Sequence, residues 1–463
     1  MKRILLIYPQ WKRDTKSIFR YMYGLFPPLG IALLAAIIEE MGYFVKIIDC
    51  SAENILPEDI TWHMKGEYDF VGISALSQSA PAAYEIARAI KSKNKNITVI
   101  IGGVHATAMP EEVASNPHVD ICVRGEGEET IKEIISQVPL ENIRGISYRR
   151  NGSVVHNPDQ EIIQDLNVYP LPAYHLLPMR SYRSMMGVAI REPSIGLVIS
   201  RGCPGECEYC FPNSLGRKVR IKSQKKILEE ILLLKNNYGV REIDFYDDTF
   251  TFFKSAIIEM CNTLIDHKVG MVWSCLTRAD FINADTLRLM KKAGCHQIMY
   301  GVESGSHKIR KKFKKNLNVD FKEVFKMTQR IGIQIRATYM IGNYDETYND
   351  VLQTIEFAKY LDSDIAIFNV CTPYPGTALY KRLDREGRII TKAWDQYDFF
   401  NVVFAHPHLT KEEIINLYKK AYLEFCLRPV VFIRQFVNLF SFTRSRLLFR
   451  LGLAFIKGII NWS

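Results

Sequence analysis

The chain of 463 residues lacks the features that several classes of protein require. It contains no low-complexity segment and no repeat of fixed period, which excludes solenoid and fibrous architectures. It contains no uninterrupted apolar run of about 18 residues, the length that a membrane-spanning helix needs. The opening run Met1–Ile7 is strand-like and lacks the longer apolar region and cleavage site of a secretory signal. We therefore expect a cytoplasmic protein whose cysteines are reduced.

Acidic residues are absent from Leu427 to Ser463, so this tail carries over half of the net charge of +10. No DNA- or RNA-binding motif accompanies the charge, and we predict no nucleic-acid partner. Basic, aromatic-rich amphipathic segments bind the membrane interface through anionic lipid, which predicts peripheral contact with the inner face of the membrane and a lipophilic substrate. The alternative is a pair of helices packed on the protein, with arginine stems covering apolar surface. The basic residues of the tail are Arg428, Arg434, Arg444, Arg446, Arg450 and Lys457.

Seven of the ten cysteines are scattered singly, and a second C-x2-C pair of the kind found in zinc sites is missing. The other three, Cys203, Cys207 and Cys210, form a C-x3-C-x2-C run directly after the apolar segment 196–200. Three thiolates on one loop hold three irons of a [4Fe-4S] cluster and leave the fourth iron open to another ligand. The spacing therefore predicts a cluster and disfavours zinc and disulfides.

The first 138 residues alternate short β-branched runs with helix-length stretches, which predicts a parallel sheet covered on both faces. This α/β pattern is typical of a Rossmann-like, doubly wound domain. No G-x-G-x-x-G follows the first strand, so a dinucleotide is not expected. The predicted strands are 3–8, 44–49, 70–75, 97–102 and 119–123, and the clearest helices are 30–41 and 82–93.

Residues 139–190 interrupt this alternation and are interpreted as a linker. Asn151-Gly152 is a hairpin signal, and Tyr169-Pro-Leu-Pro172 is hostile to helix. From 191 to 395 the alternation resumes with strands expected at 196–200, 242–246, 272–276, 297–302, 334–341 and 365–370. Six parallel units predict a partial TIM-type barrel, with its chemistry at the carboxyl ends of the strands. Residues 396–463 are expected to form a helical C-terminal region.

Taken together, these motifs resemble the cobalamin (B12)-binding radical S-adenosylmethionine (SAM) enzymes, which join a cobalamin domain to a radical SAM partial barrel. The resemblance covers roughly residues 1 to 400, and its most specific element is the run of three cysteines with Tyr209 and Phe211 beside it. In that family the open iron binds SAM, and one electron from the cluster cleaves SAM to a 5′-deoxyadenosyl radical. The resemblance thus implies three cofactors: a [4Fe-4S] cluster, SAM and cobalamin.

The resemblance also implies which residues contact SAM. Strand-end motifs of the barrel match those of the family at Phe245-Tyr-Asp-Asp-Thr-Phe250, Thr277-Arg-Ala-Asp280 and Gly301-Val-Glu-Ser-Gly305. One departure is Asn343-Tyr344-Asp345, where the family more often has proline and glycine. The SAM-binding residues carried over in this way are Tyr209, Phe211, Asp247, Asp248, Arg278, Glu303 and Ser304.

On the cobalamin side, the loops after the predicted strands supply small residues that allow close approach of a bulky ligand. The Asp-x-His-x-x-Gly motif of other cobalamin proteins is absent, and His105 lies in a different loop. We therefore expect cobalamin without a histidine below the cobalt, and a hydrogen-bonding role for His105. The expected cobalamin-contacting residues are Gly30, Ser77, Gln78, Gly102, Gly103, His105, Gly125 and Glu126.

The function that the resemblance implies is methylation of an unactivated carbon, with an external flavodoxin- or ferredoxin-type reductant. A second branch of the family forms rings or rearranges carbon skeletons, as in porphyrin cyclisation or hopanoid-type lipid modification, and the motifs do not separate the branches. A non-catalytic cobalamin-binding sensor is the competing class. It would leave the strand-end motifs of the barrel unexplained.

Overall fold

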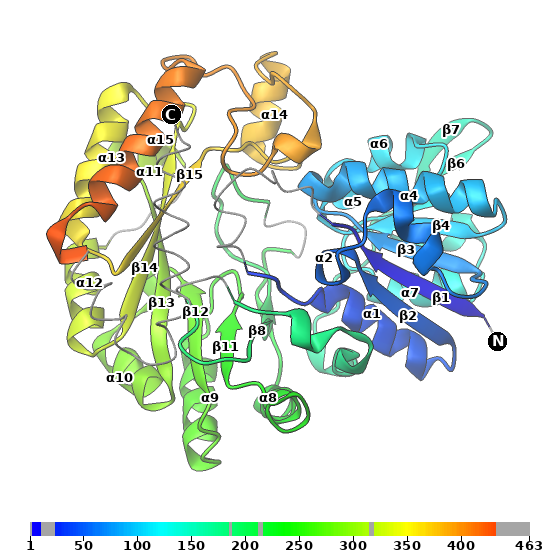
Figure 1. Cartoon of the computed structure of the whole chain (residues 1–463), viewed down its shortest axis with the longest axis horizontal. Coiled ribbons are helices and arrows are strands. Elements are labelled where there is room, and N and C mark those ends of the chain that lie inside the picture. Colours follow the sequence, from blue (N-terminus) through cyan, green and yellow to red (C-terminus); the bar gives the residue numbers. More distant parts are fainter. Residues whose placement is uncertain (1, 11–23, 185–187, 212–215, 314–318, 432–463) are drawn as a thin grey trace.

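The computed structural model describes residues 2–10, 24–184, 188–211, 216–313 and 319–431 of the chain. Two α/β domains lie next to each other (Figure 1). The strands of the first domain start at its outer edge, near the N-terminus, and β1 runs toward the second domain. The carboxyl ends of that sheet, where ligands bind in open α/β folds, therefore face the barrel.

The first sheet has the strand order β2-β1-β3-β4-β5-β6-β7 within the described ranges. Strands β1 to β5 are parallel, and their order is that of flavodoxin-like sheets. Alternate residues of β1 pack on opposite faces: Ile4 and Leu6 join the cluster under α1 and α7, whereas Leu5 and Ile7 join the cluster under α4. The parallel strands are β1 (Arg3–Tyr8), β2 (Phe44–Asp49), β3 (Phe70–Ser74), β4 (Thr98–Gly102) and β5 (Ile121–Val123).

A hairpin extends this sheet beyond the predicted domain boundary at residue 138. Strand β6 (Ile146–Arg150) pairs antiparallel with β5, and β7 (Ser153–His156) pairs antiparallel with β6. The Asn151-Gly152 turn is thus a hairpin as predicted, with Asn151 at φ 52° and Gly152 at φ 84°. Its assignment to a linker is wrong, because the open edge of β5 pairs with it. The crossing between the domains begins after His156 and contains short 3-10 turns.

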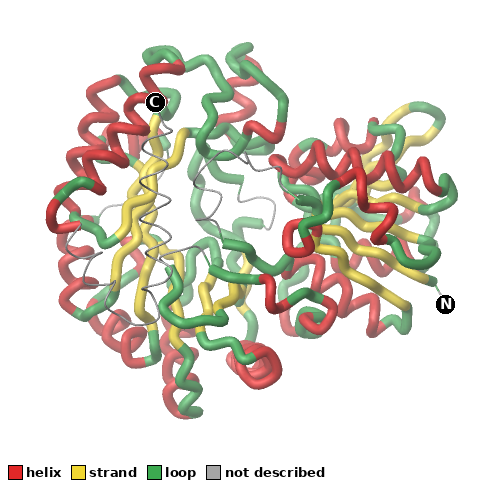
Figure 2. Tube along the Cα trace, viewed as in Figure 1, coloured by secondary structure: helices red, strands yellow, loops and turns green. Residues whose placement is uncertain are grey.

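The second sheet has the order β15-β14-β13-β12-β11-β8, and neighbouring strands within it are parallel. It curls without closing, since β8 pairs with β11 and β15 pairs with β14 at its two edges. Figure 2 shows these strands enclosed by an outer layer of helices. The strands are β8 (Ser194–Leu197), β11 (Glu242–Phe245), β12 (Val272–Thr277), β13 (Cys295–Glu303), β14 (Gln334–Ile341) and β15 (Ile365–Val370). The predicted partial barrel is confirmed, although its first strand ends at Leu197 and the pair β9 (Ser200–Arg201) and β10 (Arg220–Ile221) follows.

The helices begin and end at recognisable caps. Ser223 caps α8, Thr347 and Asp350 form a capping box at α13, and Gly239 closes α8 in the left-handed conformation. The helices of the first domain are α1 (Leu29–Glu40), α2 (Cys50–Glu53), α3 (Ile60–His63), α4 (Ala80–Lys93), α5 (Val104–Ala108), α6 (Pro110–Ser115) and α7 (Glu128–Ile135). Those that follow are α8 (Gln224–Tyr238), α9 (Lys254–Asp266), α10 (Ala284–Lys292), α11 (His307–Lys312), α12 (Phe321–Arg330), α13 (Tyr348–Leu361), α14 (Ala378–Arg385) and α15 (Lys411–Cys426).

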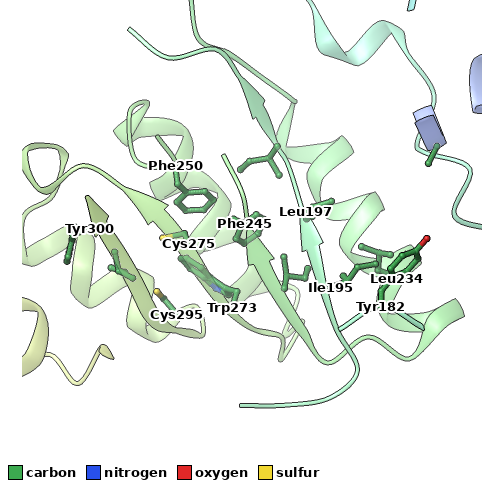
Figure 3. Close-up of a cluster of buried hydrophobic side chains, with 14 of the residues drawn as sticks. Tyr182, Ile195, Leu197, Leu234, Phe245, Phe250, Trp273, Cys275, Cys295 and Tyr300 are labelled. Carbon is green, nitrogen blue, oxygen red and sulfur yellow. The ribbon is translucent and has the colours of Figure 1, made fainter. Parts of the chain in front are cut away.

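The outward face of the barrel strands packs against these helices. Trp273, Cys275 and Phe245 belong to one cluster of buried side chains, in which the rings of Trp273 and Phe245 contact each other and Phe250 (Figure 3). Burial raises the pKa of the Cys275 thiol well above its usual value, so this cysteine belongs to the core. The apolar strand residues thus contribute to the core of the barrel.

The C-terminal part returns to both domains. Helix α15 packs on α13 and β15, while the segment around Trp394 lies against the first domain. No helix among the described residues is long and apolar enough to cross a membrane. The basic tail predicted to bind membrane lies, from residue 432 onward, outside the described residues.

Candidate functional site

The three clustered cysteines lie on the loop that follows β9, near the carboxyl ends of the barrel strands. Cys203 and Cys207 are half-buried and Cys210 is exposed. The amide of Gly205 donates to Cys203 Sγ at 3.4 Å, and Thr249 Oγ1 lies 3.5 Å from the same sulfur. A Cβ at Gly205 would lie 3.3 Å from Cys203 Sγ and 3.9 Å from Cys207 Sγ, so the glycine keeps the space between two thiols open.

The remaining cysteines differ in environment. Burial raises the pKa of Cys50, Cys122 and Cys261 to about 12, so these thiols stay protonated and are poor ligands. In the described part of the chain, no group of three or more His, Cys, Asp or Glu side chains could hold a metal ion. The cysteine loop suits a different arrangement, because in a [4Fe-4S] cluster each thiolate binds a separate iron.

Neighbouring elements hold the cysteine loop in place. The carbonyl of Glu208 accepts from Leu379 N at 2.9 Å, and the amide of Glu208 donates to Phe313 O at 3.2 Å. Phe211 packs on Gly376, where a Cβ would approach its ring to 2.7 Å. Tyr209 lies edge-on to Phe313, and burial raises its pKa well above the usual value. Both predicted aromatic residues therefore tie the loop to α14 and to the segment after α11.

The two adjacent aspartates after β11 have different surroundings. Asp247 is fully buried, and its carboxylate accepts hydrogen bonds from Ile199 N at 3.1 Å and from Ser200 N and Oγ at 2.5 Å each. Burial raises the pKa of Asp247 to about 7. Asp248 is exposed, yet desolvation by the surrounding protein raises its pKa, as expected for a carboxyl in a concavity. Asp247 thus holds the segment leading to the cysteines, and Asp248 is available to a ligand.

Arg278 and Glu303 also border the cysteine loop. Arg278 donates from Nε and Nη2 to the two carboxylate oxygens of Asp280, at 3.0 and 2.7 Å. A Cβ at Gly205 would lie 3.8 Å from Arg278 Nη1, so the third edge of the guanidinium faces the loop. Glu303 ends β13 with a φ of 69°, a left-handed conformation that is found at ligand sites. Both residues are positioned to contact a molecule bound at the cysteines.

Ser304 lies inside the protein, in contrast to its predicted ligand role. It is fully buried and forms hydrogen bonds with Thr354 Oγ1 at 3.0 Å and with Glu346 Oε1 at 3.4 Å. Glu346 in turn accepts from the amides of Gly342 and Asn343 at 2.9 and 3.0 Å, and burial raises its pKa to about 8. Ser304 and Glu346 therefore shape the loops after β13 and β14.

A cavity of about 340 Å³ lies between the two domains. Its inner part is a slot between the first sheet and helices α1 and α7, lined by apolar side chains. At Gly30 a Cβ would meet nothing within 4 Å, and at Gly125 the same holds, so both glycines widen the cavity. A flat heteroaromatic base such as that of the cobalamin nucleotide tail fits a slot of this chemistry. Of the predicted cobalamin residues, Gly30, Gly102, Gly103, Gly125 and Glu126 line it.

The other three predicted cobalamin residues are not part of this lining. His105 is fully buried, with its Nδ1 3.3 Å from Ser77 Oγ and its Nε2 3.4 Å from Glu112 Oε1. The same Glu112 oxygen accepts from Tyr84 OH at 2.9 Å and from Trp394 Nε1 at 2.8 Å. His105 therefore orients the loop that contains Ser77 and Gln78, and this network reaches the C-terminal part of the chain.

Several residues that the sequence did not single out complete the site. The barrel contributes the segment Val198–Arg201, together with Lys222, Lys226 and Glu230, to the cavity wall. Arg201 and Arg220 form ion pairs with glutamates of the first domain. The sequence did offer one indication that Arg201 belongs to the site, because this residue lies between the predicted strand 196–200 and the first of the three clustered cysteines. Its partners could not be read from that position.

Comparisons with known proteins agree with this arrangement. The chain matches the B12 binding domain over residues 16–135 and the radical SAM superfamily over residues 197–358. It is 35% identical over 453 residues to an uncharacterized methyltransferase of Pyrococcus horikoshii, with 96% of each chain covered. It is 26% identical to an anaerobic magnesium-protoporphyrin IX monomethyl ester cyclase of Rubrivivax gelatinosus, covering 91% of this chain and 77% of the cyclase.

The fold is also that of a solved structure. The radical SAM methyltransferase TsrM of Kitasatospora setae has a TM-score of 0.68 to this chain at 14% identity, covering 83% of this chain and 78% of TsrM. The predicted family, fold class and cofactors are confirmed, and an enzyme of this kind requires a small-molecule substrate and a reductant. The chain belongs to the cobalamin-dependent radical SAM enzymes, which use a [4Fe-4S] cluster, SAM and cobalamin.

Proposed function

We propose that this enzyme methylates an unactivated carbon atom of a lipophilic substrate. The proposal rests on one segment of the chain that belongs to both parts of the site, the interdomain cavity and the cysteine loop. The segment Val198–Arg201 lines the interdomain cavity and continues directly into the loop with Cys203. A methyl carrier held in the cavity and a radical generated at the cysteines would thus act on one substrate between the domains.

When bound, the cofactors supply a transferable methyl group and a radical that removes hydrogen from carbon. The chain's own residues then bind and orient. Cys203, Cys207 and Cys210 would hold the cluster, while Asp248, Arg278 and Glu303 border it and offer partners for the amino and carboxylate groups of SAM. The buried Asp247 and Ser304 form hydrogen bonds that hold the neighbouring loops in place.

The inner face of the barrel supports a substrate with an apolar body. The upper, lumen-facing positions of the strands are partly exposed, and several of them carry apolar side chains beside polar ones such as Thr338. They include Leu276 of β12, Met299 of β13, Met340 of β14 and Ile367 of β15. Methionine side chains adapt to irregular apolar ligands. A substrate with an apolar body would remove these apolar side chains from water.

Anaerobic reconstitution tests the reaction. The reconstituted protein is incubated with reductant, methyl-deuterated SAM and a lipid extract of the source organism. We expect 5′-deoxyadenosine and a lipid that carries three deuterium atoms. Cys207→Ala should abolish 5′-deoxyadenosine formation, since one iron loses its protein ligand. The buried Cys261→Ala is the matched control and should retain it. Intact SAM in the wild-type reaction would contradict the proposal.

Ring formation or skeletal rearrangement without methyl transfer is the second candidate function. It is supported by the 26% identity to the Rubrivivax gelatinosus cyclase, whose name specifies a porphyrin ester. The same labelled reaction separates the two functions. A cyclase or rearrangement enzyme would form 5′-deoxyadenosine and change the mass of a lipid without incorporating deuterium.

We also infer peripheral membrane association through the basic tail. The arginines of residues 428–450 alternate with apolar side chains, a pattern drawn to anionic lipid. A variant that ends at Val431 should lose cosedimentation with phosphatidylglycerol-containing vesicles, while the full chain sediments with them at low salt. Equal sedimentation of both proteins would contradict the inference.

A further inference from the structure

Four buried charges join the two domains beside the interdomain cavity. Arg201 Nη2 lies 2.6 Å from Glu128 Oε1, and its Nη1 lies 3.2 Å from Glu126 Oε1. Arg220 binds the same Glu126 with both terminal nitrogens, at 2.7 and 2.9 Å. Their side chains are between 2% and 17% exposed. Removing one member would leave a buried charge without its partner, so the four side chains hold each other in place.

This group of four, here called the charge bridge, touches both halves of the site. Glu126, Glu128 and Arg201 line the cavity. Arg201 also stands two residues before Cys203, and its strand β9 pairs with β10 at Arg220. The backbone of the preceding Ser200 is fixed by Asp247. Displacement of the glutamates would therefore be transmitted to the start of the cysteine loop.

We propose that Arg201 is a positioning residue that couples occupancy of the cavity by cobalamin to the stability of the cluster on the cysteine loop. The proposal rests on the cobalamin site described above. A ligand that fills the cavity would restrain the side chains of Glu126 and Glu128, which bind Arg201. Arg201 would in turn restrain the backbone that leads to Cys203. By linkage the effect is reciprocal, so an assembled cluster raises the affinity for cobalamin by the same factor.

The experiment measures cluster loss with and without cobalamin. The reconstituted wild-type protein is mixed with an iron chelator, and decay of the cluster absorbance is followed with the cavity empty or saturated with hydroxocobalamin. We expect cobalamin to slow the loss of iron, and the assembled cluster to raise the affinity for hydroxocobalamin by about 5-fold or more, a typical size for such coupling. The reciprocal measurement compares hydroxocobalamin affinity between the cluster-loaded protein and the Cys203→Ser, Cys207→Ser, Cys210→Ser variant.

Two variants assign the coupling to Arg201. Glu128→Gln keeps the shape of the side chain but removes the charge that Arg201 contacts, and Arg201→Lys removes the geometry that spans two carboxylates. Because both residues line the cavity, the affinity of each variant for hydroxocobalamin is measured first and the decay is compared at saturation. There we expect the ratio of the decay rates to fall toward one. The matched control is Glu424→Gln, which removes the charge from the 2.7 Å pair between Glu424 of α15 and Lys359 of α13 and should leave the ratio unchanged.

The outcomes separate the two proposals. If the wild-type cluster decays at the same rate with and without bound cobalamin, the coupling is overturned and the proposed function remains intact. A wild-type ratio that persists in Glu128→Gln and Arg201→Lys would overturn the role of Arg201. Failure of the protein to bind cobalamin at all would remove the proposed cobalamin site and the coupling together.

Discussion

Asp247 is a residue whose protonation is predicted to make stability depend on pH. Burial raises its pKa from 3.8 to about 7. Between these values the folded protein holds a proton that the unfolded chain releases, so the free energy of unfolding falls as pH rises from about 4 to about 7. Asp247→Asn should flatten this dependence in urea unfolding measured across that range. Glu346, with a pKa raised to about 8, acts in the same direction, so some slope remains.

The control for this prediction is Asp285→Asn, because the Asp285 side chain is 91% exposed. It should leave the slope as in the wild type. A slope in Asp247→Asn equal to that of the control would show that Asp247 releases its proton at similar pH in both states.

The roles of individual residues were only partly predictable. The strand-end motifs predicted Asp247, Asp248 and Ser304 as SAM-binding residues, but Asp247 and Ser304 are buried and bond to neighbouring loops. Which of two adjacent side chains turns inward depends on the partners that surround it. Asp247 meets two free amides at Ile199 and Ser200, whereas Asp248 faces outward. Those amides come from a segment almost 50 residues away, so local sequence carries no sign of the contact.

Among the elements, the loop between β15 and α14 is predicted to support the cysteine loop through Gly376. This glycine has a φ of 85°, and a Cβ there would lie 2.7 Å from the Phe211 ring. Gly376→Ala should destabilise the protein by about 1 to 3 kcal/mol through overpacking, in addition to the cost of the left-handed conformation. It should also lower the iron content after reconstitution, as measured by iron per protein.

Gly387→Ala is the matched control for that change. Gly387 has a φ of 67°, and a Cβ there meets nothing within 4 Å, so the variant carries the backbone strain alone. It should lose about 1 kcal/mol of stability and keep its iron. Equal iron content in both variants would mean that Phe211 does not transmit the change to the cysteines.

Most strands and helices were predictable because their signals are local. Buried parallel strands are continuous apolar runs, and β1, β12 and β14 match the predicted ranges within one or two residues. The hairpin β6–β7 was recognised as a turn but not as part of the first sheet. Its pairing with β5 depends on the free edge of that strand, a tertiary property that the turn sequence does not encode.

At the level of the whole molecule, the contact between the domains was not predictable. Trp394 and Glu112 are 282 residues apart, and neither lies in a sequence motif that predicts contact with the other. Their hydrogen bond brings the segment after α14 onto the first domain, beside His105. Together with the charge bridge it fixes how the two halves of the site face each other, because each contact joins a side chain of one domain to one of the other.

Trp394→Phe is expected to weaken this interdomain contact, because it removes the indole N–H that donates to Glu112 at 2.8 Å. A hydrogen bond to a charged group contributes about 1.5 to 3 kcal/mol, so the variant should lose that much stability in urea unfolding. In a double-mutant cycle with Glu112→Gln, the two losses should be non-additive by about 1 kcal/mol or more, since the residues are in contact. The matched control Trp62→Phe changes an indole that is 85% exposed and should cost little. Additive losses would mean that the hydrogen bond between Trp394 and Glu112 contributes little to the contact between the domains.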